Sequence, residues 1–121
     1  MANTFKVVNF AAEPNASGTP YVIYTAASST TTVVLGLILT NIHTAQVTTI
    51  VRLVSDTANR AITNNTANGT SLLVKDAPIP VGGSLEILTG SKVVLETTDQ
   101  LTVDCSVADK LSGTLSIMEI T

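Results

Sequence analysis

Apolar residues recur at every second position in several short runs of this chain, which is the side-chain period of a β-strand. The longest such run is residues 31–42. Its apolar residues fall on both parities: Val33, Leu35, Leu37 and Leu39 on one, and Val34, Ile38 and Ile42 on the other. Both faces are therefore expected to be covered, as in a central strand or a strand at an interface. The β-branched residues 30–34 disfavour the rival interpretation, a buried helix.

The same alternation predicts further strands on both sides of this run, separated by segments rich in Pro, Gly, Asn and Ser. The predicted strands are residues 4–10, 20–26, 47–55, 71–75, 84–88, 92–96, 100–107 and 113–120. Pro78 and Pro80 exclude a central strand over residues 76–83. In residues 100–107, Leu101, Val103, Cys105 and Val107 are expected to face inward, and Thr102, Asp104 and Ser106 outward.

This pattern predicts an all-β, single-domain antiparallel β-sandwich or jelly-roll-like barrel of about 8–9 short strands. We expect residues 1–20 to form an N-terminal arm with a short strand, and residues 21–121 to form the β-sandwich domain. Residues 56–71 form the one long polar insertion, rich in Asn and Thr, with Asn68-Gly69 as a turn signal. Loops of that length in small domains are usually functional or mobile.

Composition points to assembly with other chains. Only 12% of the residues are charged and 45% are hydrophobic, where about 25% charged is usual. A surface so poor in charge is poorly protected against association, so a homo-oligomer is expected. The net charge is −3, and the chain lacks the basic stripe that is typical of nucleic-acid binders. It also lacks an apolar run of about 18 residues, so no membrane span is predicted. The first residues lack the pattern of a signal peptide, and a single cysteine excludes an internal disulfide.

No motif predicts catalysis, a cofactor or a metal site, and we expect a protein that is not an enzyme. His43 is the only histidine and no nucleophile motif lies near it, so an exposed turn residue is the simpler interpretation. Cys105 is expected to be buried and inert. Five carboxylates at strand ends and in turns are expected to be solvated: Asp76, Glu86, Glu96, Asp99 and Asp104. Two alternatives stay open, a glycosidase pair among them and calcium bound by Asp99 and Asp104.

Four stretches resemble a family of small virion structural proteins of tailed bacteriophages, of the type found in cyanophages. They are Tyr24-Thr25-Ala26, residues 31–41 (TTVVLGLILTN), residues 73–103 and residues 113–120. Members of that family serve as capsid decoration (cement) proteins or as baseplate and tail components. The resemblance implies a virion protein, assembled in the host cytoplasm, that binds the outer head surface as an oligomer and stabilises the shell. Two departures are Ala27-Ser28, where a proline turn is usual, and the longer insertion at residues 56–71.

The resemblance favours a trimer that binds the major capsid protein or other virion proteins. The alternative is a tail, baseplate or fibre component that binds a host glycan through residues 56–71, although the chain has few aromatic rings for stacking on sugars. No nucleic acid or membrane partner is expected. The candidate interface residues are Phe5, Val7, Phe10, Leu37, Ile38, Arg52, Arg60, Asn64, Asn65 and Asn68.

Overall fold

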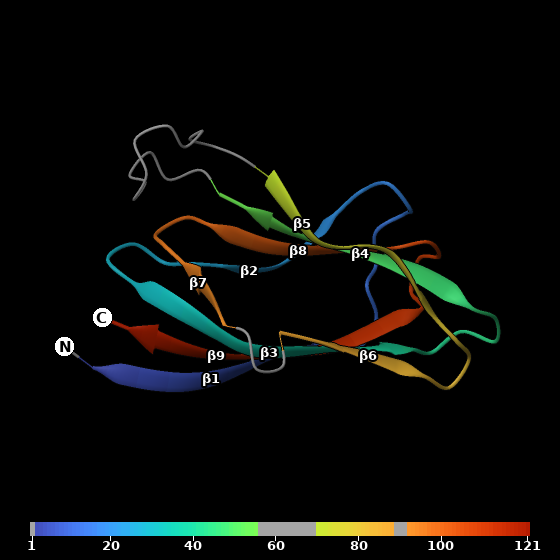
Figure 1. Cartoon of the computed structure of the whole chain (residues 1–121), viewed down its shortest axis with the longest axis horizontal. Helices are drawn as coiled ribbons and strands as arrows, with labels where there is room; N and C mark the ends of the chain where they lie inside the picture. The colour runs from blue at the N-terminus through green and yellow to red at the C-terminus, as the bar shows by residue number, and fades with distance from the viewer. Residues whose placement is uncertain (1, 56–69, 89–91) are drawn as a thin grey trace.

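The computed structural model describes residues 2–55, 70–88 and 92–121. Within these residues it contains nine β-strands and no helix (Figure 1). The strands are β1 (Asn3–Phe10), β2 (Tyr21–Thr25), β3 (Thr31–Asn41), β4 (Val47–Val54), β5 (Thr70–Ile79), β6 (Ser84–Ile87), β7 (Val93–Leu95), β8 (Gln100–Cys105) and β9 (Leu111–Ile120). All nine lie where the apolar alternation predicts a strand.

The strands form two antiparallel sheets that pack face to face (Figure 1). Sheet A has the order β1-β9-β3-β6, and β7 also pairs with β3, beyond β6 along that strand. Sheet B has the order β2-β8-β4-β5. The two sheets do not close into a barrel, so the predicted sandwich is confirmed and the barrel alternative is not. β3 has β9 on one side and both β6 and β7 on the other, as expected of a central strand.

Aliphatic side chains from both sheets fill the space between them. Leu37, Leu39, Leu115 and Ile117 of sheet A face Val51, Leu101 and Val103 of sheet B, and all are almost fully buried. At one end of this core, the ring of Phe10 lies over Gly113 of β9 and contacts the Tyr21 ring edge to face, with centroids 5.7 Å apart. Burial of these side chains supplies the main favourable term in folding.

A β-bulge in β3 changes which of its residues face the core. The register with β9 shifts between Val34 and Gly36, so the side chains that point inward are Val34 before the bulge and Leu37 and Leu39 after it. Leu35 and Ile38 point to the outer face instead. Within the single chain only the inner face of this strand is covered, because Ile38 is 43% exposed. Coverage of the outer face at an interface stays a prediction.

Two other strands differ from their predictions. β5 continues through Pro78 to Ile79, because it is an edge strand in which a missing N–H can face away from the ladder. In β8 the inward set is confirmed, but Thr102 and Asp104 are buried too. Asp104 accepts hydrogen bonds from the backbone N–H of Gly18, which brings the connection before β2 against the outer side of β8.

Residues 11–20 are fastened to the sandwich by Glu13, which is fully buried. Its carboxylate accepts hydrogen bonds from the backbone N–H groups of Asn15 and Cys105, and its own backbone bonds to Leu111 and Asp109. Burial raises the pKa of this carboxyl, and Asp104 and Asp109 nearby raise it further. The strand expected within the arm is present as β1, and it pairs with β9 along its whole length. Whether residues 1–20 act as a separate arm stays a prediction.

Candidate interaction surface

The outer face of sheet A carries four of the eight large apolar side chains that are exposed among the described residues. Strand register places on it, beside small polar residues, the side chains of Phe5, Val7, Val33, Leu35, Ile38, Val94, Met118 and Ile120. We call these eight residues the outer apolar face. Phe5 and Val33 lie on either side of Met118, and Val94 lies beyond Val33, so the apolar side chains cross four strands without a break.

Several of these side chains are largely open to solvent. Phe5 is 72% exposed, Val7 62% and Val94 53%. Among the described residues that the register assigns to this side of sheet A, Glu86 is the only charged one. A contiguous apolar surface with so little charge typically marks a site of protein–protein contact.

Two shallow hollows lie on this face around Leu35, at the β-bulge of β3. One shallow hollow of about 350 Å³ lies between Leu35, Ile38 and Ile87, and another of about 310 Å³ lies between Leu35 and the side chains of Phe5 and Val7. Both hollows are open and largely apolar. The polar lining is Glu86, Thr114 and Ser116 in the first hollow and Lys6 and Ser116 in the second. Shallow, mostly apolar hollows of this kind suit the side chains of a partner protein.

The structure divides the predicted interface residues into four groups. Phe5, Val7 and Ile38 lie on the outer apolar face. Phe10 and Leu37 point into the core, with exposures of 7% and 1%, so they cannot contact a partner while the sandwich is intact. Arg52 points away from the Val47 and Val51 side of β4, to the outer side of sheet B. The last four lie outside the described residues: Arg60, Asn64, Asn65 and Asn68.

Sequence reasoning missed Leu35, Val94 and Met118 as surface residues. The available signal was Gly36 in the middle of an apolar run, because a glycine inside a strand often marks a bulge that switches the parity of the side chains. Strict alternation assigned Leu35 to the same face as Leu37, and the bulge puts them on opposite faces.

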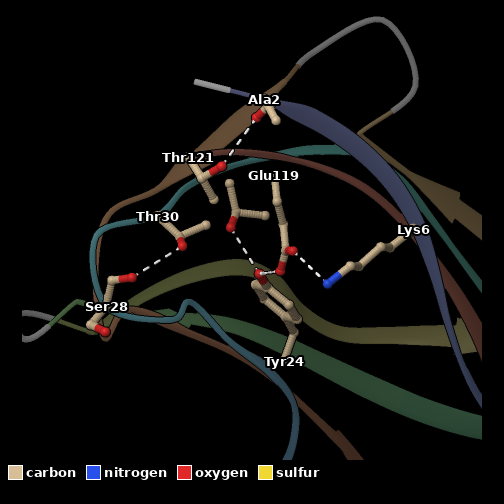
Figure 2. A network of polar contacts seen from close by, with 8 residues as sticks. Ala2, Lys6, Tyr24, Ser28, Thr30, Glu119 and Thr121 are labelled. Carbon is tan, nitrogen blue, oxygen red and sulfur yellow. Dashed lines mark hydrogen bonds and ion pairs between the residues drawn. The ribbon is translucent and has the colours of Figure 1, made fainter.

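A polar network closes one end of the sandwich beneath this surface (Figure 2). Lys6 of β1 forms an ion pair with Glu119 of β9 at 2.7 Å. The hydroxyl of Tyr24 in β2 donates to the other oxygen of Glu119, and it accepts from the hydroxyl of Thr32 in β3 at 2.8 Å. The network therefore joins three strands of sheet A to sheet B.

The two ionisable groups that Tyr24 and Glu119 bring to this network both have shifted pKa values. Hydrogen bonds from Lys6 and Tyr24 hold the pKa of Glu119 below its ordinary value. Burial, and then the hydrogen bond to Glu119, raise the pKa of Tyr24. A general acid or base needs a pKa close to the working pH, and both shifts move away from neutrality.

The other candidate chemical residues serve the fold. His43 is half-buried rather than exposed, and its backbone N–H donates to the side-chain oxygen of Asn41. Cys105 is buried as predicted, and burial raises the pKa of its thiol. Asp99 and Asp104 were predicted to be solvated, which is wrong, because each is 4% exposed and accepts backbone hydrogen bonds.

Within the described ranges, no three His, Cys, Asp or Glu side chains lie close enough together to hold a metal ion. The same part of the chain contains no helix with the length and apolar character that a membrane crossing requires.

The two packed sheets define an all-β sandwich. No model of a known protein family matches the chain, and no curated protein matches its sequence. A chain of the T13 IBDV viral particle is similar in structure, with a TM-score of 0.52 and 10% identity over 97% of this chain. A chain of the infectious bursal disease virus Gx strain gives a TM-score of 0.51 and 13% identity over 96%.

This chain spans only 30% and 32% of those two viral chains, so the likeness shows a shared fold. A chain of Bacillus endospore appendages, described as disulfide-linked pili, has 15% identity and a TM-score of 0.46 over 99% of this chain and 87% of its own length.

Proposed function

We propose that this chain is a structural, non-catalytic protein of a bacteriophage virion, and specifically a decoration (cement) protein of the head. In this role it binds the major capsid protein through the outer apolar face and stabilises the shell. The resemblance to phage virion proteins favours a trimer as the bound form, and sedimentation equilibrium distinguishes a trimer from a two-fold dimer.

The observation that carries the proposal is the outer apolar face itself. The three long strands β1, β9 and β3, with β6 and β7 sharing a fourth position beside β3, span roughly 500 Å² on one side of sheet A, from the strand spacing and rise. A standard interface buries about 800 Å² on each partner. The face is therefore somewhat small for one independent contact, which suits a protein whose binding is repeated over many copies on a symmetric shell.

Two further points support a virion rather than another assembly. The sequence resembles small virion proteins of tailed phages over most of residues 24–120. The sandwich also shares its fold with chains of viral particles. Neither point distinguishes a protein of the head from one of the tail. The number of copies of this chain per particle distinguishes them.

Quantitative mass spectrometry of purified virions, scaled to the major capsid protein, measures that copy number. We expect several hundred copies for a decoration protein. A few dozen copies or fewer would contradict the head assignment and favour the tail or baseplate alternative. Absence from purified particles would contradict a virion role altogether.

A matched pair of surface variants tests the proposed face. Ile38 on sheet A and Val22 on β2 of sheet B are both 43% exposed. Ile38→Lys places a charge in the outer apolar face, and we expect at least a tenfold loss of occupancy on particles stripped of the native protein. Val22→Lys adds the same charge elsewhere and is expected to bind normally. Equal binding of the two folded variants would remove this face from the proposal.

A further inference from the structure

The outer edge of β1 is an open row of backbone donors and acceptors. The N–H of Ala2 donates to the carbonyl of Thr121 at 3.1 Å, and the N–H of Thr121 donates back to Ala2 at 3.0 Å. Hydrogen-bonded pairs alternate along an antiparallel ladder. The backbones of Thr4, Lys6, Val8 and Phe10 therefore bond to β9, and those of Asn3, Phe5, Val7 and Asn9 point away from it. No described strand pairs with that side.

This edge lacks the devices that normally protect edge strands, which are shortness, bulges, prolines and unpaired charges. β1 has eight residues, no proline and one continuous register with β9. Its one charged side chain, Lys6, is already paired with Glu119 of the same chain.

The other described edges are each protected. β2 has five residues and a register shift, and β6 and β7 have four and three residues. β5 carries two register shifts, Pro78, and Asp76 with a positive φ of 51°. An added strand would find a regular template of full length only at β1.

We propose that β1 pairs with β1 of a second copy of this chain, antiparallel and centred on Lys6. This inference needs only the open edge and does not depend on the virion role; it proposes a two-fold pair in place of the trimer that the family resemblance favours. In the centred register all four outward-pointing residues form hydrogen-bonded pairs, Asn3 with Asn9 and Phe5 with Val7 of the other copy, and each pair occurs twice. Phe5 and Val7 are the two most exposed large apolar side chains described, and the contact places each against the other.

The two-fold axis of such a pair is perpendicular to the sheet, so both outer apolar faces look in the same direction. Joining them doubles the continuous surface to about 1,000 Å², which exceeds the roughly 800 Å² per partner of a standard interface. Lys6 faces its symmetry mate across the axis, and the ion pair with Glu119 offsets the repulsion of the two ammonium groups.

Single-cysteine variants map the contact. In the centred register Lys6 forms a non-hydrogen-bonded pair with its mate, with Cα atoms about 4.5 Å apart, which a disulfide can span. We expect Lys6→Cys to give a cross-linked dimer under mild oxidation. The native Cys105 is 1% exposed and does not compete.

Val94→Cys is the matched control. Val94 is 53% exposed, close to the 52% exposure of the Lys6 side chain, but it lies on β7, away from the β1 edge. A yield at position 6 at least fivefold above that at position 94 supports the proposal. Equal yields overturn it, and stronger linking in Phe5→Cys or Val7→Cys overturns the centred register.

A proline tests the backbone bonds without relying on cysteines. The N–H of Val7 points to the open edge, so Val7→Pro removes a bond to the second copy and none to β9. Val7→Thr keeps the N–H and is the control. In sedimentation equilibrium we expect a monomer–dimer exchange for the native chain and for Val7→Thr, and at least a tenfold higher dissociation constant for Val7→Pro. Circular dichroism checks that Val7→Pro is folded. A monomer at all concentrations, or the trimer that the family resemblance favours, would overturn the two-fold contact.

Discussion

Substitution of Gly113 tests the placement of Phe10 in the core, where the sequence had suggested an interface residue. A Cβ at position 113 would lie 2.3 Å from Cζ and 2.4 Å from Cε1 of the Phe10 ring. Ordinary carbon contacts are about 3.5–4.0 Å, so Gly113→Ala forces the ring to move by more than about 1 Å. The ring is 7% exposed and is held against Tyr21, which leaves it little room.

The expected cost is that of an overpacked core, about 1–3 kcal/mol in the free energy of unfolding. For 121 residues the unfolding entropy is about 0.25 kcal/mol per kelvin, so Tm is expected to fall by about 4–12 °C. Thermal and urea unfolding measure both quantities. Gly36→Ala is the control, because a Cβ there meets nothing within 4 Å, and we expect its stability to be unchanged or up to about 1 kcal/mol higher.

A double-mutant cycle assigns the cost to the ring. Phe10→Leu shortens the side chain that Gly113→Ala collides with, so most of the penalty is expected to disappear when the two are combined. If Gly113→Ala costs the same in both backgrounds, or costs nothing in either, then Phe10 does not occupy the position described.

Two carboxyl groups whose pKa values are shifted in opposite directions predict opposite responses to pH. The pKa of Glu13 is raised above 4.5, so its contribution to the free energy of unfolding favours the folded state at low pH and is lost as pH rises through the folded pKa. The urea midpoint of the native protein should therefore fall above pH 4.5, and we expect Glu13→Gln to make that fall smaller. Parallel curves of midpoint against pH for the two proteins would contradict this. The pKa of Glu119 is lowered, so its contribution to stability is present above pH 4.5 and is lost on acidification. Tyr24→Phe removes a hydrogen bond to Glu119, so we expect it to lower the free energy of unfolding by about 1–3 kcal/mol at pH 7 and to move acid unfolding to a higher pH. Tyr21→Phe is the control, and an acid transition that Tyr24→Phe leaves unshifted would contradict the prediction.

The positions of the strands were predictable because burial of one face imposes a period of two on each strand. The alternation in residues 100–107 correctly placed Leu101, Val103 and Cys105 in the core. The low charge content correctly indicated an exposed apolar surface, and Phe5, Val7 and Ile38 lie on it. These are local signals, which the sequence carries directly.

Long-range pairing explains the failures. Nothing near Phe10 shows that Gly113, more than a hundred residues later, leaves room for its ring. Glu13 lies in a turn-rich segment with no periodicity, and its burial depends on the distant N–H of Cys105. The edge position of β5, which allows it to pass through Pro78, also follows only from the order of strands in sheet B.

The reciprocal hydrogen bonds between Ala2 and Thr121 bring the two ends of the described chain together at one end of sheet A (Figure 1). A linker of a few residues could therefore join them and turn β9 and β1 into consecutive strands of a hairpin. A circularly permuted chain, opened at the short turn between β3 and β4, would keep every strand pair of both sheets. In that topology the open edge strand becomes an interior part of the sequence, tethered on both sides.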